Sequence, residues 1–168
     1  MTHMPNWTIK PEPIGAPDVD DVMEQYFDEM GRRVLGREAT ETEKRAALTA
    51  DPNDKLAPPR GLFLVARDPD GEFLGCAGVR LLPADPRTAE LKRMFVHPAG
   101  RGAGLGRGLL LAVEDAARTL GAKRIVCETN TKLTEARTLY TRNGYAETEP
   151  YEGHGKADHW FAKDLDRP

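Results

Sequence analysis

The sequence of 168 residues has only two cysteines and no long hydrophobic run. Cys76 and Cys127 lie far apart in separate apolar segments, so we expect two buried thiols rather than a disulfide or a metal site. No apolar run approaches the ~20 residues that a membrane span requires, which argues against a transmembrane helix. Residues 1–7 lack the apolar core of a signal peptide. We therefore expect a cytoplasmic protein with no membrane partner.

The chain also lacks a strong excess of charge of either sign. Its 24 Lys and Arg residues and 27 Asp and Glu residues give a net charge of -3. Nucleic-acid-binding domains usually carry an excess of basic residues, so this balance argues against a nucleic-acid partner. The four histidines show no spacing typical of a metal site, and we expect no metal. The length and the 39% share of hydrophobic residues favour a single soluble domain over residues 1–168.

Apolar residues recur at helical spacing in some segments and in short runs typical of strands in others. Thr40 and Glu43 have the spacing of a capping box, Gly36 is a candidate helix stop, and Thr134 is a candidate N-cap. The predicted strands cover residues 7–11, 62–65, 73–82, 90–96, 124–129, 145–147 and 159–165. The predicted helices cover residues 18–35, 40–49, a long segment that ends near 120, and 134–143.

The most informative feature is a glycine-rich turn at residues 101–106, Arg-Gly-Ala-Gly-Leu-Gly, between a predicted strand and the long predicted helix. Glycine has no Cβ, so a ligand can approach the backbone closely. The first N–H groups of a helix lack internal partners, and the helix dipole places partial positive charge there. The turn therefore predicts an anion site that suits a pyrophosphate.

Three other interpretations of these glycines can be considered, and the sequence argues against the first two. A P-loop requires Lys-Ser or Lys-Thr after the glycines, and neither dipeptide follows. A dinucleotide-binding fold requires Gly-x-Gly-x-x-Gly near the first strand, whereas here the spacing is Gly102-x-Gly104-x-Gly106, past the middle of the chain. The third interpretation is a tight strand-to-helix turn without a ligand.

Residues 96–110, Val-x-Pro-x-x-Arg-Gly-x-Gly-x-Gly-x-x-Leu-Leu, resemble the acyl-CoA-binding signature of the GNAT superfamily of N-acetyltransferases. Residues 136–145, Ala-x-x-Leu-Tyr-x-x-x-Gly-Tyr, are similar to a second element of that family. The resemblance is strongest over residues 90–145 and extends over 61–165. The sequence departs from the family at Leu133, where an asparagine often contacts the cofactor, and Asn130 is the candidate replacement.

The resemblance implies an α/β fold with a mixed, twisted central sheet of about seven strands and helices on both faces. In this fold strands 4 and 5, here residues 90–96 and 124–129, splay apart, and the pantetheine arm of acetyl-CoA enters the gap. The resemblance implies main-chain contacts from the first of these strands and N–H groups for the pyrophosphate from the turn. The implied cofactor-binding residues are Met94, Phe95, Val96, Arg101, Gly102, Ala103, Gly104, Leu105, Gly106, Arg107 and Asn130.

Transfer of an acetyl group to an amine needs a neutral amine, stabilisation of an oxyanion and a proton for the leaving sulfur. The resemblance places Tyr140 as the general acid, and a phenol with an ordinary pKa of about 10 is protonated at neutral pH. Glu128 and Glu90 are the candidate bases, with Glu128 the first choice. The plainer interpretation is a structural tyrosine and two solvated strand carboxylates. Neither cysteine stands in a nucleophile motif, which favours direct transfer.

The resemblance implies acceptor contacts from the loop before the last strand and from the first helix. The candidates are Tyr26, Glu29, Tyr151, Glu152 and His159. We expect an acyl-CoA-dependent N-acetyltransferase whose acceptor is a small-molecule amine or a protein N-terminus or lysine. The alternative is a non-catalytic acyl-CoA-binding or regulatory module. The resemblance alone implies a homodimer.

Overall fold

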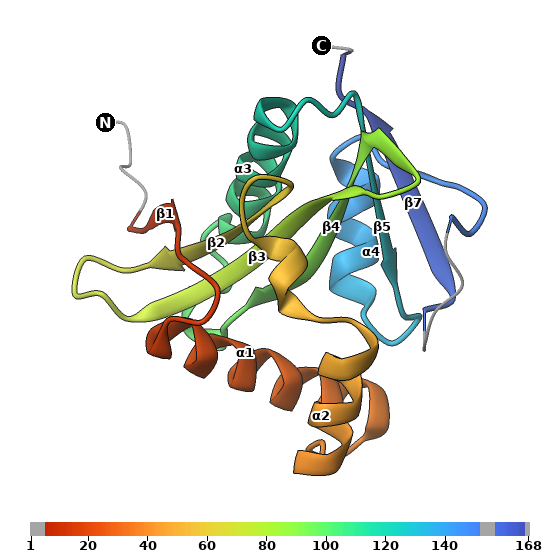
Figure 1. Cartoon of the computed structure of the whole chain (residues 1–168). Helices are drawn as coiled ribbons and strands as arrows, with labels where there is room; N and C mark the ends of the chain where they lie inside the picture. The colour runs from red at the N-terminus through yellow and green to blue at the C-terminus, as the bar shows by residue number, and fades with distance from the viewer. Residues whose placement is uncertain (1–5, 152–156, 167–168) are drawn as a thin grey trace.

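The computed structural model describes residues 6–151 and 157–166. Within this part of the chain, seven strands form one mixed sheet in the order β1-β2-β3-β4-β5-β7-β6 (Figure 1). The strands are β1 (Thr8–Pro11), β2 (Gly61–Arg67), β3 (Phe73–Leu82), β4 (Asp85–Val96), β5 (Arg124–Thr129), β6 (Ala146–Glu147) and β7 (His159–Asp164). The helices are α1 (Pro17–Met30), α2 (Glu41–Ala50), α3 (Leu105–Thr119) and α4 (Thr134–Arg142), with short turns η1 (Gly31–Leu35), η2 (Asn53–Leu56) and η3 (Pro98–Gly100).

The predicted order of strands and helices is confirmed, and several local signals explain it. Thr40 and Glu43 form the reciprocal capping box at the start of α2. The helix predicted over residues 18–35 is α1 followed by the π-helical turn η1, and Gly36 ends it in the left-handed region. None of the helices in the described residues is long and apolar enough to span a membrane.

Two local predictions were wrong. β4 was predicted to begin at residue 90 and begins at Asp85. The reason is a tight turn after Leu82, which pairs Leu82 with Asp85 and so starts the second strand of the hairpin five residues sooner. Thr134 is the first residue of α4 rather than its N-cap, and Leu133 occupies the cap position without a side-chain cap hydrogen bond. The turn at Asn130 is the reason, because the Asn130 carbonyl accepts from the Leu133 N–H and fixes the chain before the helix begins.

Helices cover both faces of the sheet, as Figure 1 shows. We call the two sides the α3 face and the α1 face. Because successive side chains of a strand point to opposite faces, alternate residues of each strand enter two different cores. On the α3 face, α3 and α4 pack on a cluster that includes Leu91, Ile125, Cys127 and Phe161. On the α1 face, α1 and η2 pack on a smaller cluster that includes Phe95.

β4 and β5 separate soon after they meet. They pair in parallel only at Thr88 with Arg124, Ala89 with Ile125, and Glu90 with Val126. Beyond these pairs β5 follows β7 as far as Thr129, while β4 continues beside β3. The splay expected between strands 4 and 5 is therefore confirmed, and it leaves the edge of β4 after Glu90 unpaired by β5.

One buried carboxylate ties the two halves of the splayed sheet together through α3. Glu114, fully buried on α3, accepts a hydrogen bond from the Tyr145 hydroxyl at 2.9 Å and another from Lys163 Nζ on β7 at 3.0 Å. Burial, together with the neighbouring Glu114 carboxylate, raises the pKa of Tyr145, so this hydroxyl remains a donor. A charged group in this position stabilises the fold only while its partners are present.

Replacing Glu114 with alanine leaves the buried Tyr145 hydroxyl without its acceptor. A buried unsatisfied polar group costs about 1–3 kcal/mol, so we expect the free energy of unfolding to fall by about 2 kcal/mol in urea denaturation. Asp115→Ala is the control, because that neighbouring carboxylate is 80% exposed and pairs with the half-exposed Arg118 at the surface. The control should lose less than about 0.5 kcal/mol. Equal losses in the two variants would contradict this role of Glu114.

Candidate functional site

A β-bulge in β4 sets the geometry of the site. Lys92 lies opposite Gly78 and Phe95 lies opposite Cys76, so Arg93 and Met94 together face the single residue between those partners. Arg93 adopts a positive φ of 55°, which is rare for a residue other than glycine. Because one residue is inserted, the alternation of side chains reverses along β4. Leu91 points to the α3 face before the bulge, and Met94 does so after it.

The side chain of Arg93 holds the bulge in place from the α1 face. Its guanidinium donates to Asp51 Oδ2 at 3.1 Å, to the Asp51 carbonyl at 2.7 Å and to Asn53 Oδ1 at 3.1 Å. It also lies over the rings of Tyr26 and Phe27 at 5.7 and 5.3 Å from their centroids. Burial raises the pKa of Tyr26. The predicted acceptor contact Tyr26 thus lies against the bulge.

The glycine-rich turn has the conformation expected of an anion site. Gly102 and Gly104 have φ values of 83° and 79°, and a Cβ built on either would meet no other atom within 4 Å. Gly104 is the N-cap of α3, a helix of 15 residues, and no side chain caps it. The first N–H groups of α3 therefore have no side-chain cap at the positive end of the helix dipole.

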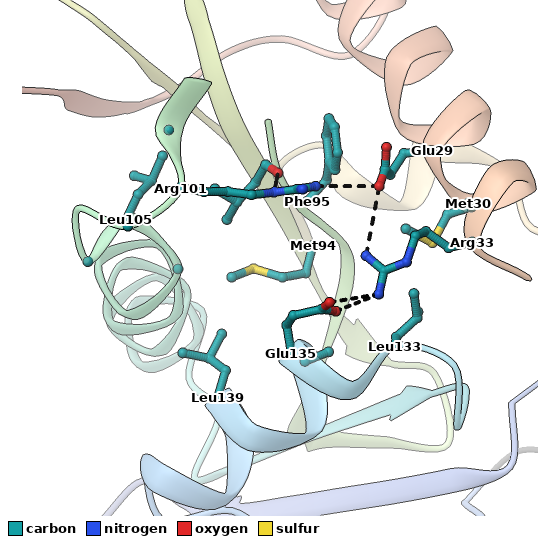
Figure 2. A pocket seen from close by; sticks show the side chains of 16 residues that line it. Glu29, Met30, Arg33, Met94, Phe95, Arg101, Leu105, Leu133, Glu135 and Leu139 are labelled. Atoms are coloured by element: carbon teal, nitrogen blue, oxygen red, sulfur yellow. Dashed lines mark hydrogen bonds and ion pairs between the residues drawn. The ribbon is translucent and has the colours of Figure 1, made fainter. Parts of the chain in front are cut away.

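A cleft of about 390 Å³ extends from this turn along β4. Figure 2 shows Met94 in the middle of the cleft, with α3 on one side and α1 on the other. Eight of the predicted cofactor-binding residues line it: Met94, Phe95, Val96, Arg101, Gly102, Gly104, Leu105 and Gly106. Ala103, Arg107 and Asn130 are not among the lining residues. The opposite wall is lined by residues of the α4 region: Leu133, Ala136 and Leu139. The apolar side chain of Leu133 thus occupies the position where the family pattern often has asparagine.

Four charged side chains of alternating sign run along one edge of the cleft (Figure 2). The Arg101 guanidinium lies 3.4 Å from Glu29, Glu29 lies 3.8 Å from Arg33, and Arg33 donates two hydrogen bonds to Glu135 at 2.7 and 2.8 Å. We call Arg101, Glu29, Arg33 and Glu135 the charge chain. The Arg33 guanidinium lowers the pKa of Glu135. Of the four, the sequence prediction missed Arg33 and Glu135.

The predicted acceptor contact Glu29 lies in this cleft, whereas the candidate base Glu90 lies on the α1 face of the sheet. Glu90 is only 2% exposed and accepts from Arg80 Nε at 2.8 Å and from the Tyr151 hydroxyl at 2.7 Å. Lys92 Nζ lies 3.6 Å from Glu90 Oε1. Burial and the Glu90 charge raise the pKa of Tyr151, which remains protonated. The structure therefore brings Tyr151 and Glu90 together.

The second candidate base, Glu128, shares a face with Glu90. Glu90 is paired with Val126 in parallel register, so the two side chains point to the same side of the sheet. Glu128 is two residues further along β5 and has the same orientation. Trp160 of β7 is its paired neighbour. The two carboxylates thus lie on the α1 face on either side of the point where β4 and β5 separate.

Tyr140 lies on the other face. Its ring is only 3% exposed and packs against the rings of Tyr145 and Phe161, each with a centroid distance of 5.6 Å. It shares the α3-face cluster with the buried thiol of Cys127, and burial raises the pKa of its phenol well above 10. Leu139 lines the cleft, and Tyr140 is not among the lining residues.

His159, another predicted acceptor contact, is placed apart from Glu90. Its Nε2 lies 3.0 Å from the Thr131 hydroxyl, next to Asp158, at the far end of the β5–β7 pair. The predicted contact Glu152 falls outside the residues that the structure describes. Among those that it does describe, no group of three or more His, Cys, Asp or Glu side chains could hold a metal ion.

Comparisons with known proteins agree with this geometry. The family model for the acetyltransferase (GNAT) family matches residues 20–145. A protein of Azospirillum brasilense named IAA acetyltransferase is 33% identical over 152 residues, which cover 90% of this chain and 92% of that protein.

Two solved structures share the fold. An acetyltransferase of the GNAT family from Staphylococcus aureus has a TM-score of 0.77 at 16% identity, covering 95% of this chain and 99% of that one. The yncA protein of Salmonella typhimurium, solved with its cofactor acetyl-CoA, has a TM-score of 0.66 at 21% identity, covering 97% and 96%. Because the family model spans most of the sequence and the fold agrees, this chain belongs to the GNAT family and is an acyl-CoA-dependent acetyltransferase.

Proposed function

We propose that this protein transfers an acetyl group from acetyl-CoA directly to a primary amine. The observation that carries the proposal is the cleft that begins at the uncapped start of α3 and follows β4 as far as Met94, along the part of the strand that β5 leaves unpaired. A diphosphate and an extended amide-bearing arm need an anion site and an unpaired strand edge in this order. The similarly folded yncA protein binds acetyl-CoA as its cofactor.

The residues of the cleft suit the two polar parts of that cofactor. The N–H groups at the start of α3 and the Arg101 guanidinium would hold the diphosphate. The main-chain groups of Met94 and Val96 on the free edge of β4 would pair with the amides of the pantetheine arm. Apolar contacts from Leu133 and Leu139 would cover the arm from α4.

We assign the base to Glu128 and a positioning role to Glu90. Glu90 accepts hydrogen bonds from Arg80 and from Tyr151, and we assign it the role of positioning these two side chains. A base matters more for some amines than for others. At pH 7 an α-amine with a pKa of about 8 needs about 1.4 kcal/mol to lose its proton, whereas a lysine with a pKa of about 10.4 needs about 4.6 kcal/mol.

We assign the general acid to Tyr140, on the opposite side of the gap. As the amine attacks the thioester carbon, the carbon–sulfur bond breaks and the thiolate needs a proton. The raised pKa of the buried phenol keeps this proton available at neutral pH. An N–H group of β4 between Met94 and Val96 would stabilise the oxyanion. The acidic groups on the α1 face suit a cationic amine as the acceptor.

Gly104→Val should weaken acetyl-CoA binding on the order of tenfold, because the added side chain would occupy the open space that the diphosphate needs. Binding can be measured by calorimetric titration. Gly121→Val is the matched control, since Gly121 has a φ of 98° and open space at the other end of α3. Both variants carry the backbone strain of about 1–2 kcal/mol, but only the first should lose affinity. Unchanged affinity in Gly104→Val would contradict the anion site.

Tyr140→Phe should lower kcat at least severalfold, and up to about 100-fold, with little change in the affinity for acetyl-CoA. Release of the CoA thiol in the presence of an amine panel measures the rate. Tyr145→Phe is the control, because it removes a neighbouring buried hydroxyl from the same aromatic cluster. Equal losses of rate in both variants, or equal losses of rate and affinity in Tyr140→Phe, would argue against a proton donor.

The pH dependence gives a separate test of the same assignment. The acid acts in its protonated form, and the pKa of Tyr140 lies well above 10, so the phenol keeps its proton while the acceptor amine loses one. We expect kcat/KM to rise with pH and to show no falling limb below pH 10. A falling limb in that range that disappears in Tyr140→Phe would show that the phenol titrates too early.

A further inference from the structure

Glu29 is the one acidic member of the charge chain that contacts Arg101, the arginine of the proposed diphosphate site. Its carboxylate is only 11% exposed and has three guanidinium neighbours: Arg32 at 3.2 Å, Arg101 at 3.4 Å and Arg33 at 3.8 Å. Arg101 is 49% exposed and also donates to the Val96 carbonyl at 3.2 Å. In this structure the cation of the proposed anion site is therefore held by a carboxylate.

The contacts favour an exchange of partners. If Arg101 leaves, Glu29 keeps Arg32 and Arg33, so no buried charge is stranded and the cost of departure is small. A diphosphate offers the Arg101 guanidinium a doubly charged, bidentate partner, which binds more strongly than one carboxylate oxygen at 3.4 Å. Glu29 then remains near the bound diphosphate as a like charge.

Arg33 joins the α1 side of the cleft to α4 independently of Arg101. It donates both to Glu135 and, at 3.3 Å, to the Lys132 carbonyl, and Lys132 Nζ in turn donates to the Val34 carbonyl at 2.9 Å. These contacts join η1 to the start of α4 across the cleft and do not involve Arg101. The α1 and α4 walls of the cleft can therefore stay joined when Arg101 changes partner.

We propose that Glu29 is a competing carboxylate that holds Arg101 in the empty enzyme and weakens the binding of CoA, so that the product is released more readily. The proposal rests on the function proposed above and assigns to Glu29 a positioning role toward Arg101 rather than a contact with the reacting atoms. It implies that wild-type affinity for CoA is lower than the residues of the turn could provide.

Glu29→Gln keeps the shape of the side chain and removes its charge. We expect the Kd for CoA, measured by calorimetric titration at low ionic strength, to fall on the order of threefold. Glu38→Gln is the matched control, because this exposed carboxylate also pairs with Arg32 but does not line the cleft. The control should leave the Kd unchanged. An unchanged or higher Kd in Glu29→Gln would overturn the proposal.

A double-mutant cycle with Arg101→Ala distinguishes competition of Glu29 for Arg101 from direct repulsion between Glu29 and the diphosphate. If Glu29 acts by holding Arg101, the gain from Glu29→Gln should disappear when Arg101 is absent. A gain that persists undiminished would overturn the exchange. Pantetheine, which has no diphosphate, is the second probe, and Glu29→Gln should not change its Kd. Tighter pantetheine binding would also overturn the proposal.

A crystal structure of the wild-type protein with CoA provides a test that does not depend on the folding of a variant. The contact between Arg101 and Glu29 should be broken and that between Arg33 and Glu135 retained. A retained Arg101–Glu29 contact beside a bound diphosphate would contradict the inference. Failure of the wild type to bind CoA would instead refute the proposed function, so the two failures are distinguishable.

Discussion

The cleft depends on the inserted residue in β4. A positive φ at Arg93 costs on the order of 1–3 kcal/mol, and the contacts of its guanidinium with Asp51, Asn53 and two aromatic rings offset this cost. Burial alone would raise the pKa of Asp51, but Lys92 and Arg93 lower it below its ordinary value. The bulge is what turns Met94 toward the α3 face and leaves its main chain on the free edge of the strand.

The two faces of the sheet divide the chemistry between them. The start of α3, the α4 wall of the cleft and the buried phenol of Tyr140 lie on the α3 face, while Glu90, Glu128 and Tyr151 lie on the α1 face. Charged groups that line the cleft are paired with one another, as in Arg33 with Glu135 and Arg101 with Glu29. Ligand binding at such a site proceeds by exchange of partners, since no charge has to be left without one.

The sheet and the splay of β4 and β5 were predicted from the family resemblance, whereas the features predicted correctly from the residues themselves are local. The glycines of the turn, the capping box at Thr40 and the helix end at Gly36 depend on residues a few positions apart, so the sequence pattern is enough to predict them. The bulge was not predicted, because Arg93 is not a glycine and its conformation depends on contacts some 40 residues away. The ion pair of Arg33 with Glu135 joins residues 102 positions apart, and only the fold brings them together.

The narrow seam between β4 and β5 has a mechanical consequence. Three residue pairs provide little backbone resistance to rotation of one half of the sheet against the other. Side-chain contacts therefore add to the resistance against this rotation. The helix α3 packs on β2, β3 and β4 and reaches β7 through the hydrogen bond between Lys163 and Glu114. The two parts of the sheet that border the gap are thus joined by a helix behind the sheet as well as by the three paired positions of β4 and β5.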